Sequence, residues 1–222
     1  MSGQRGVDLA PVHGAPAWWI RAYRIGFGLL GILALVWIPL RNIDSATFSL
    51  TNYLSYFTIE SNVLSVVVLL VGGALAPRSP RWQTFRGAVT LYMLITMVVY
   101  AVLLANVDVM LTDKWINDVL HRILPLVLLL DWLFVPMAKR LRPTPALIGQ
   151  WLIFPVVYGV YSLIRGPIVD WYPYPFIDPR VQGWVSLTIG LLVLLVVFVV
   201  LAVAMAGLGD LPARWRERKT TD

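Results

Sequence analysis

The chain has 222 residues, of which 59% are hydrophobic and only 14% are charged, whereas a soluble domain averages about 25% charged residues. Together with a mean hydropathy of +0.75, this composition excludes an ordinary soluble domain and indicates an all-α integral membrane protein. The net charge of +6 does not indicate nucleic-acid binding, because the basic residues gather at the ends of apolar segments. The absence of cysteine excludes disulfides, thiolate metal sites and thiol nucleophiles.

Six apolar segments follow one another, each close to the ~20 residues that cross ~30 Å of hydrocarbon. They cover residues 22–40, 57–76, 87–107, 119–138, 146–164 and 183–207. Because the connections are short, we expect one domain of six transmembrane helices over 17–209. A polar N-terminal tail over 1–16, without a cleavable signal peptide, and a basic C-terminal tail over 210–222 flank it.

Lysine and arginine are distributed unevenly between the two sides of these segments. One side holds 13 of the 18 basic residues, which are Arg5, Arg21, Arg24, Arg78, Arg81, Arg86, Lys139, Arg140, Arg142, Arg214, Arg216, Arg218 and Lys219. The positive-inside rule therefore predicts that both termini are cytoplasmic and that three loops lie outside. We expect a multi-pass protein of the cell (inner or plasma) membrane.

The second segment opens with an unusual density of polar residues in "FTIESN" (57–62). Counting ~20 residues back from its inner end places Thr58 just inside the outer boundary. The same count on the fourth segment, which also runs from outside to inside, places His121 within about 1.5 Å of that depth. We therefore expect Thr58 and His121 to meet if their helices are neighbours. Asn62 shares the Thr58 face of the helix, with Ser61 beside it.

The fourth segment adds a second polar cluster. Asn117 precedes His121 by four residues. Asp118 has His121 at i+3 and Arg122 at i+4, so the Asp118 carboxylate could reach both of these side chains. Asp131 lies ten residues further, about 15 Å deeper. Two interpretations of Asp131 stay open: it pairs with a cation of the inner leaflet, or it carries a proton.

The stretch "DWYPYPFIDPR" (170–180) joins the fifth and sixth helices. Its prolines make it stiff and non-helical. It is either a loop of the interfacial aromatic belt or a lid over a pocket, formed by Tyr174, Pro175 and Phe176.

A threonine and a histidine at the same depth support acyl transfer. Imidazole can take the proton of a hydroxyl, which then attacks an ester carbonyl and forms an acyl-threonine. Asn117 or Asp118 could orient the imidazole, and Ser61, Asn62 or Arg122 could stabilise the oxyanion. We expect no metal or other cofactor, because a single histidine lies within the membrane. We expect membrane lipids and a lipid ester as partners.

The six-helix layout, Thr58 at the start of the second helix, "NDVLH" (117–121) and "DWYPYPF" (170–176) resemble the androgen-induced/FAR-17a family, which includes the androgen-dependent TFPI-regulating protein and a bacterial branch. The resemblance implies a threonine hydrolase of fatty-acid esters, with Thr58 as nucleophile and His121 as its base. It also matches Asp131 to an acidic residue of the family. Pro125 and the polar stretch after Thr58 depart from the pattern of the animal members.

Two other interpretations remain. Thr58 is a suitable N-cap, and Glu60 in the first turn would suit the helix dipole without any chemistry. The chain could also be a non-catalytic small transporter or a binding or structural module. In that case Glu60, His121, Arg122 and Asp131 would line a polar pathway.

Overall fold

The computed structural model describes residues 17–104, 113–135, 141 and 143–209, and every regular element in these ranges is a helix. The α-helices are α1 (Trp18–Asn42), α2 (Leu50–Leu54), α3 (Phe57–Ala74), α4 (Pro80–Val99), α5 (Lys114–Asp118), α6 (Leu124–Phe134), α7 (Pro145–Val169) and α8 (Pro179–Leu208). Two π-helices, η1 (Tyr100–Leu104) and η2 (Val119–Ile123), and one 3-10 helix, η3 (Pro175–Ile177), complete them. The all-α prediction is confirmed, and the predicted tails 1–16 and 210–222 lie outside the described residues.

Five helices are long and apolar enough to cross a membrane, namely α1, α3, α4 with η1, α7 and α8. They indicate a multi-pass membrane protein and correspond to five of the six predicted segments. The predicted fourth segment, 119–138, is helical from Val119 to Phe134 as η2 and α6, and residues 136–138 lie outside the described ranges. The short helix α5 precedes it, so that a helical run extends from Lys114 to Phe134. This run is not among the five, and it contains Asp118, Arg122 and Asp131.

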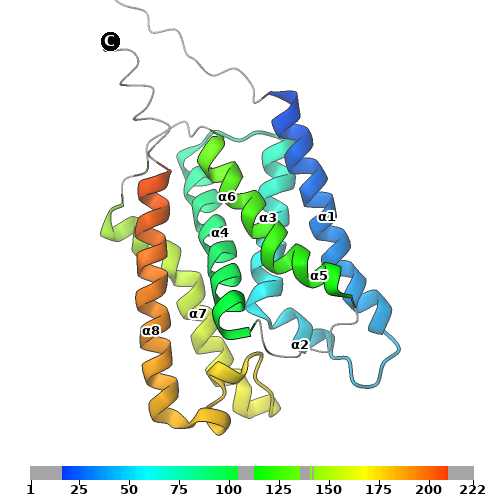
Figure 1. Ribbon diagram of the computed structural model, residues 1–222, viewed down its shortest axis with the longest axis vertical. Helices are drawn as coiled ribbons and strands as arrows, with labels where there is room; N and C mark the ends of the chain where they lie inside the picture. The colour runs from blue at the N-terminus through cyan, green and yellow to red at the C-terminus, as the bar shows by residue number, and fades with distance from the viewer. Residues whose placement is uncertain (1–16, 105–112, 136–140, 142, 210–222) are drawn as a thin grey trace, which may run out of the picture.

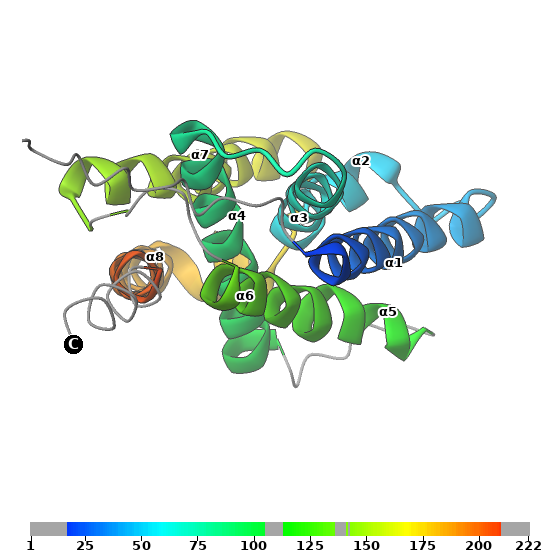
Figure 2. The same cartoon turned by 90° about the horizontal axis from the view of Figure 1, so that it is seen from above.

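The helix α4 lies at the centre of the bundle, in contact with α3, α6, α7 and α8, and every residue from Arg86 to Thr96 is buried. The helix α1 packs along α3, whereas α7 and α8 lie on the other side of α4 (Figures 1 and 2). Figure 1 shows that α1 begins and α8 ends at the same end of the bundle, which we call the basic end. We call the opposite end, where α3 begins and α7 joins α8, the loop end.

Asp131 on α6 is buried at the basic end between two arginines. Its carboxylate accepts hydrogen bonds from Nε of Arg24 at 2.7 Å and from Nε of Arg86 at 2.8 Å. Arg24 also donates to the carbonyl of Gly72 in the last turns of α3, at 3.0 Å. A buried charge is tolerated only where such partners surround it. The ion pairs therefore join α1, α4 and α6, and the hydrogen bond from Arg24 to Gly72 joins α3 to them.

Two tryptophans fill the space beside Gly87 on α4. A Cβ atom at this position would lie 2.4 Å from the ring of Trp151 and 2.7 Å from that of Trp132, so a side chain there would displace a ring. Trp151 donates through Nε1 to the carbonyl of Thr84 at 2.9 Å, and Trp132 donates to that of Met205 at 3.0 Å. These bonds join α7 to α4 and α6 to α8.

The loop between α7 and α8 is held at both of its ends. Asp170 ends α7 in the left-handed conformation (φ 51°), and its side chain pairs with Arg180. Arg180 also pairs with Asp178 at 2.8 Å and lies over the ring of Tyr172. Gly183 interrupts the start of α8 with a φ of 75°, a conformation that favours glycine. Arg180 therefore ties the end of α7 and the loop to the start of α8.

Candidate active site

Thr58 and His121 meet at the loop end. Thr58 is the second residue of α3 and His121 lies in η2. The Thr58 Oγ1 atom is 3.3 Å from Nε2 of His121, across a separation of 63 residues. The threonine is buried and the histidine is half-buried. The structure thus brings the two predicted catalytic residues within hydrogen-bonding distance.

The main chain of Asn117 orients the imidazole. Its carbonyl oxygen lies 3.1 Å from Nδ1 of His121. Because a carbonyl can only accept, Nδ1 carries the ring proton, and Nε2 presents its lone pair to the Thr58 hydroxyl. The orienting role predicted for Asn117 therefore falls to its backbone. Its side chain instead donates to the Tyr100 hydroxyl at 2.5 Å.

Two π-helical turns lie beside the pair. The first, η1, begins with Tyr100, whose ring stacks on His121 with centroids 4.3 Å apart and planes 28° apart. The second, η2, contains His121 itself. Such wide turns are rare and occur often at functional sites. Sequence periodicity gives no signal for them, and Tyr100 was not among the predicted site residues.

Tyr174 contacts Thr58 twice. Its hydroxyl oxygen accepts a hydrogen bond from the Thr58 backbone N–H at 3.2 Å and lies 3.3 Å from Oγ1. The hydroxyl proton can therefore be directed at Oγ1. Burial raises the pKa of Tyr174 to about 12, so this hydroxyl stays protonated at neutral pH. Tyr174, predicted only as a lid residue, is thus placed to donate a hydrogen bond to the threonine oxygen.

Ser61 and Asn62 support Thr58 from its carbonyl side. Both donate to the Thr58 carbonyl oxygen, at 3.1 and 2.8 Å. Asn62 Nδ2 also donates to the carbonyl of Leu120 in η2 at 3.1 Å, and Ser61 Oγ lies 2.9 Å from Oγ1 of Thr96 on α4. Both side chains are fully buried. They hold α3 against η2 and α4, and their hydrogen bonds are made away from the threonine hydroxyl.

The other three predicted supporting residues bind elsewhere. Arg122 pairs with Asp118 one turn away and lies over the Tyr100 ring, and both charged side chains are exposed. Asp131 is enclosed by arginines at the basic end, ten residues from His121, or about 15 Å along the helix. The structure does not bring these residues to Thr58.

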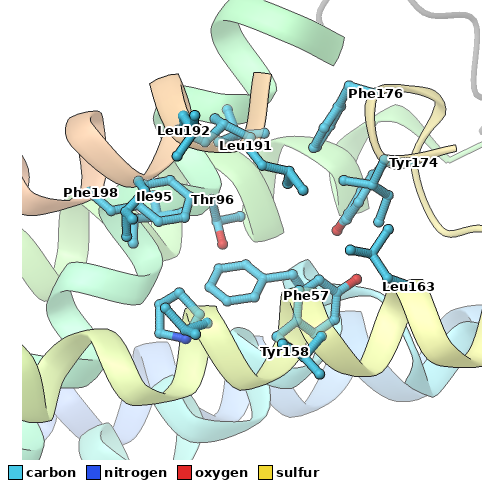
Figure 3. A pocket seen from close by; sticks show the side chains of 18 of the residues that line it. Phe57, Ile95, Thr96, Tyr158, Leu163, Tyr174, Phe176, Leu191, Leu192 and Phe198 are labelled. Atoms are coloured by element: carbon cyan, nitrogen blue, oxygen red, sulfur yellow. The ribbon is translucent and has the colours of Figure 1, made fainter. Parts of the chain in front are cut away.

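Tyr174 and Phe176, two of the three predicted lid residues, line the loop end of a cavity. Phe176 stacks on Tyr174 with centroids 5.1 Å apart, and Pro175 begins η3. The cavity has a volume of about 330 Å³ and is bounded by α3, α4, α7, α8 and the loop. Thr58 lines its wall, and no charged side chain does. Figure 3 shows Tyr174 and Phe176 together at one end of it.

Thr58 does not act as an N-cap. The N-cap of α3 is Tyr56, whose side chain makes no capping bond, and the Thr58 N–H is instead bound by Tyr174 from outside the helix. Glu60 lies in the first turn of α3 and is half-buried, in the position that suits the helix dipole.

Comparison of the chain with models of protein families, with curated proteins and with solved structures found no match. The resemblance to the androgen-induced/FAR-17a family therefore stays a prediction based on short motifs.

Proposed function

We propose that this chain is a membrane-embedded threonine hydrolase that cleaves fatty-acid esters. One observation supports it above all: the ordered series of the Thr58 hydroxyl, the imidazole of His121 and the carbonyl of Asn117. This is the arrangement of nucleophile, base and orienting group that activates a hydroxyl. The apolar cavity beside Thr58 suits the hydrocarbon part of such a substrate.

In the first half of the reaction, His121 Nε2 takes the proton of the Thr58 hydroxyl as Oγ1 bonds to the ester carbonyl carbon. Base catalysis of this kind contributes roughly 10²–10⁴-fold. The oxyanion that forms accepts a hydrogen bond from the Tyr174 hydroxyl. The bond to the alcohol oxygen then breaks, and the leaving alkoxide takes the proton from Nε2. The products are an alcohol and an acyl-threonine.

In the second half, His121 takes a proton from water as the water oxygen bonds to the acyl carbon. The bond to Thr58 Oγ1 breaks, Oγ1 takes the proton back from Nε2, and the fatty acid leaves. Throughout, Nδ1 keeps its proton and its bond to the Asn117 carbonyl, so the ring returns to its starting tautomer.

We further propose that the run from Lys114 to Phe134 is a sixth crossing and that both termini face the cytoplasm of the cell membrane. Asp131, which lies in this run, forms ion pairs with Arg24 and Arg86 on other helices. These pairs lower the free-energy cost of placing its charge in the membrane. The described basic residues Arg21, Arg24, Arg78, Arg81 and Arg86 belong to the side predicted to carry the excess of positive charge, which supports the cytoplasmic placement of the basic end. The site then lies near the outer leaflet.

A non-catalytic binding module is the second candidate. It is favoured by the two hydrogen bonds between Thr58 and Tyr174, which could serve only to anchor the loop to α3. The transporter version of this candidate needs a polar pathway through Arg122 and Asp131, and each of these is already ion-paired.

Labelling with a fluorophosphonate probe tests the proposal, since the probe reacts with activated hydroxyls. The purified protein in detergent should be labelled, and Thr58→Ala and His121→Ala should each lose the label. Thr90→Ala is the matched control, because Thr90 is a buried threonine that bonds only within its own helix α4. Absence of label on folded wild type, or equal labelling of all four proteins, would contradict a Thr58 nucleophile.

A further inference from the structure

We propose that the cavity between α7 and α8 is an acyl-chain site that opens sideways into the bilayer and that Ile95 and Phe198 limit the length of chain it accepts. The inference rests on the proposed function for the position of the ester. The binding of the hydrocarbon chain is a separate claim that can be tested without catalysis.

The hydroxyl groups in the cavity wall differ in whether their hydrogen-bond partners also line the cavity. The hydroxyl of Thr96 binds Ser61, that of Tyr158 donates to the Ser55 carbonyl, and that of Thr188 donates within α8. Thr58 and Tyr174, by contrast, bind each other at the loop end of the cavity. A ligand that fits this wall is apolar along its length and carries its polar group at one end.

The shape of the cavity fits one hydrocarbon chain. Its lining on α8 extends from Thr188 to Phe198, which is about 15 Å along the helix axis. The cavity has a volume of about 330 Å³ along this lining. An extended hydrocarbon chain matches this length and the apolar character of the lining.

The lining residues indicate the direction in which a bound acyl chain would extend from Thr58. Tyr174 and Phe176 form one end of the cavity, and Ile95 and Phe198 form the other (Figure 3). Because α8 runs from the loop end to the basic end (Figure 1), a chain whose ester lies at Thr58 would extend toward the centre of the bundle. Phe198 stands at its far end.

The opening lies between α7 and α8. Val160 on α7 and Leu192 on α8 both line the cavity, yet they are 53% and 59% exposed. Residues that belong to a cavity wall and to the outer surface mark the rim of an opening. These helices are among those long and apolar enough to span the membrane, so the opening would face hydrocarbon rather than water.

The first experiment measures binding in the Thr58→Ala variant, so that no turnover is needed. The full-length protein in phospholipid nanodiscs is irradiated with a palmitic acid that carries a terminal diazirine, and the labelled peptides are identified by mass spectrometry. We expect labelling of the segments that contain Ile95 and Phe198, and competition by unlabelled palmitate. Labelling spread evenly over the exposed faces of α1 and α8 would overturn the acyl-chain site.

The second experiment measures hydrolysis of p-nitrophenyl esters from acetate to stearate. Val160→Trp should lower kcat/KM for long-chain esters at least about tenfold and leave the acetate within about twofold. Val157→Trp is the matched control, since Val157 is 58% exposed on the same helix and does not line the cavity. Phe198→Ala should shift the preferred chain to a longer one.

The two experiments separate the claims. Localised photolabelling without ester hydrolysis would support the acyl-chain site and contradict the hydrolase. Hydrolysis that is independent of chain length, or equal effects of Val160→Trp and Val157→Trp, would overturn the acyl-chain site and leave the hydrolase standing.

Discussion

Tyr174 reaches from the loop before α8 to the first turn of α3, where its hydroxyl oxygen lies 3.2 Å from the Thr58 nitrogen and 3.3 Å from Thr58 Oγ1. The hydroxyl that binds the resting threonine is therefore also beside the point where negative charge would develop. A substitution that removes this hydroxyl alone separates its chemical role from the packing of its ring.

Tyr174→Phe should lower kcat roughly 100-fold, the usual loss for one oxyanion donor, with a smaller change in KM. The ring would still pack on Phe176. Tyr172→Phe is the control, because it removes a hydroxyl from the same loop while keeping the ring under Arg180. Steady-state hydrolysis of an ester by both variants checks the prediction, and equal kcat values for the two would contradict it.

The pKa of about 12 for Tyr174 sets a pH dependence. The hydroxyl proton is present below this pKa and lost above it, so the ratio of wild-type to Tyr174→Phe activity should stay constant from about pH 6 to about pH 9. The folded pKa lies above the usual value of about 10. The stability contributed by the protonated form should therefore decline only as the pH rises from about 10 toward 12. Activity ratios and thermal midpoints measured across this range test both statements.

Asn62→Ala should disturb the geometry of Thr58 and His121, although the Asn62 side chain is hydrogen-bonded to neither the threonine hydroxyl nor the imidazole. The amide holds the Thr58 carbonyl and the Leu120 carbonyl together, so its loss would let α3 and η2 shift relative to each other. We expect kcat to fall about tenfold or more and stability to fall by about 1–3 kcal/mol.

The control for this variant is Ser65→Ala. Ser65 is equally buried on α3 and donates only to the carbonyl of Asn62 in its own helix, so it should change stability slightly and kcat little. Equal kcat for Asn62→Ala and wild type would show that the hydrogen bonds of the Asn62 amide do not position the threonine.

Asp131→Ala should act on stability rather than on chemistry. It would leave Arg24 and Arg86 buried without their anion, at a cost of about 3–5 kcal/mol. Asp118→Ala breaks an exposed pair with Arg122 and should cost less than about 1 kcal/mol. Thermal unfolding in detergent compares the two variants. A stable Asp131→Ala protein that loses its activity would instead favour a proton-carrying role for this residue.

Much of the fold follows from composition and segment length. Apolar segments of membrane-spanning length predicted five helices that the structure contains, and the counting of depth placed Thr58 and His121 at one level. Depth can be counted from the sequence because the rise of a helix is fixed at about 1.5 Å per residue. The two residues meet only because α3 and η2 are neighbours, which the count of residues does not show.

The rest of the site depends on features without a local signal. The π-helical turns that carry Tyr100 and His121 leave no mark in hydrophobic periodicity. The insertion of Tyr174 depends on how the loop folds back over α3, and the pairing of Arg24 with Asp131 joins residues 107 positions apart. Such contacts are set by packing of the whole bundle rather than by any one segment.

The most direct test of the account is to trap the acyl-enzyme. The protein is mixed with a medium-chain p-nitrophenyl ester, quenched in acid within the first turnover, digested and examined by mass spectrometry. We expect an acyl group on Thr58 in the wild type and in Thr90→Ala, and none in Thr58→Ala or His121→Ala. Hydrolysis that proceeds without acylation of Thr58, or that survives in Thr58→Ala, would contradict it.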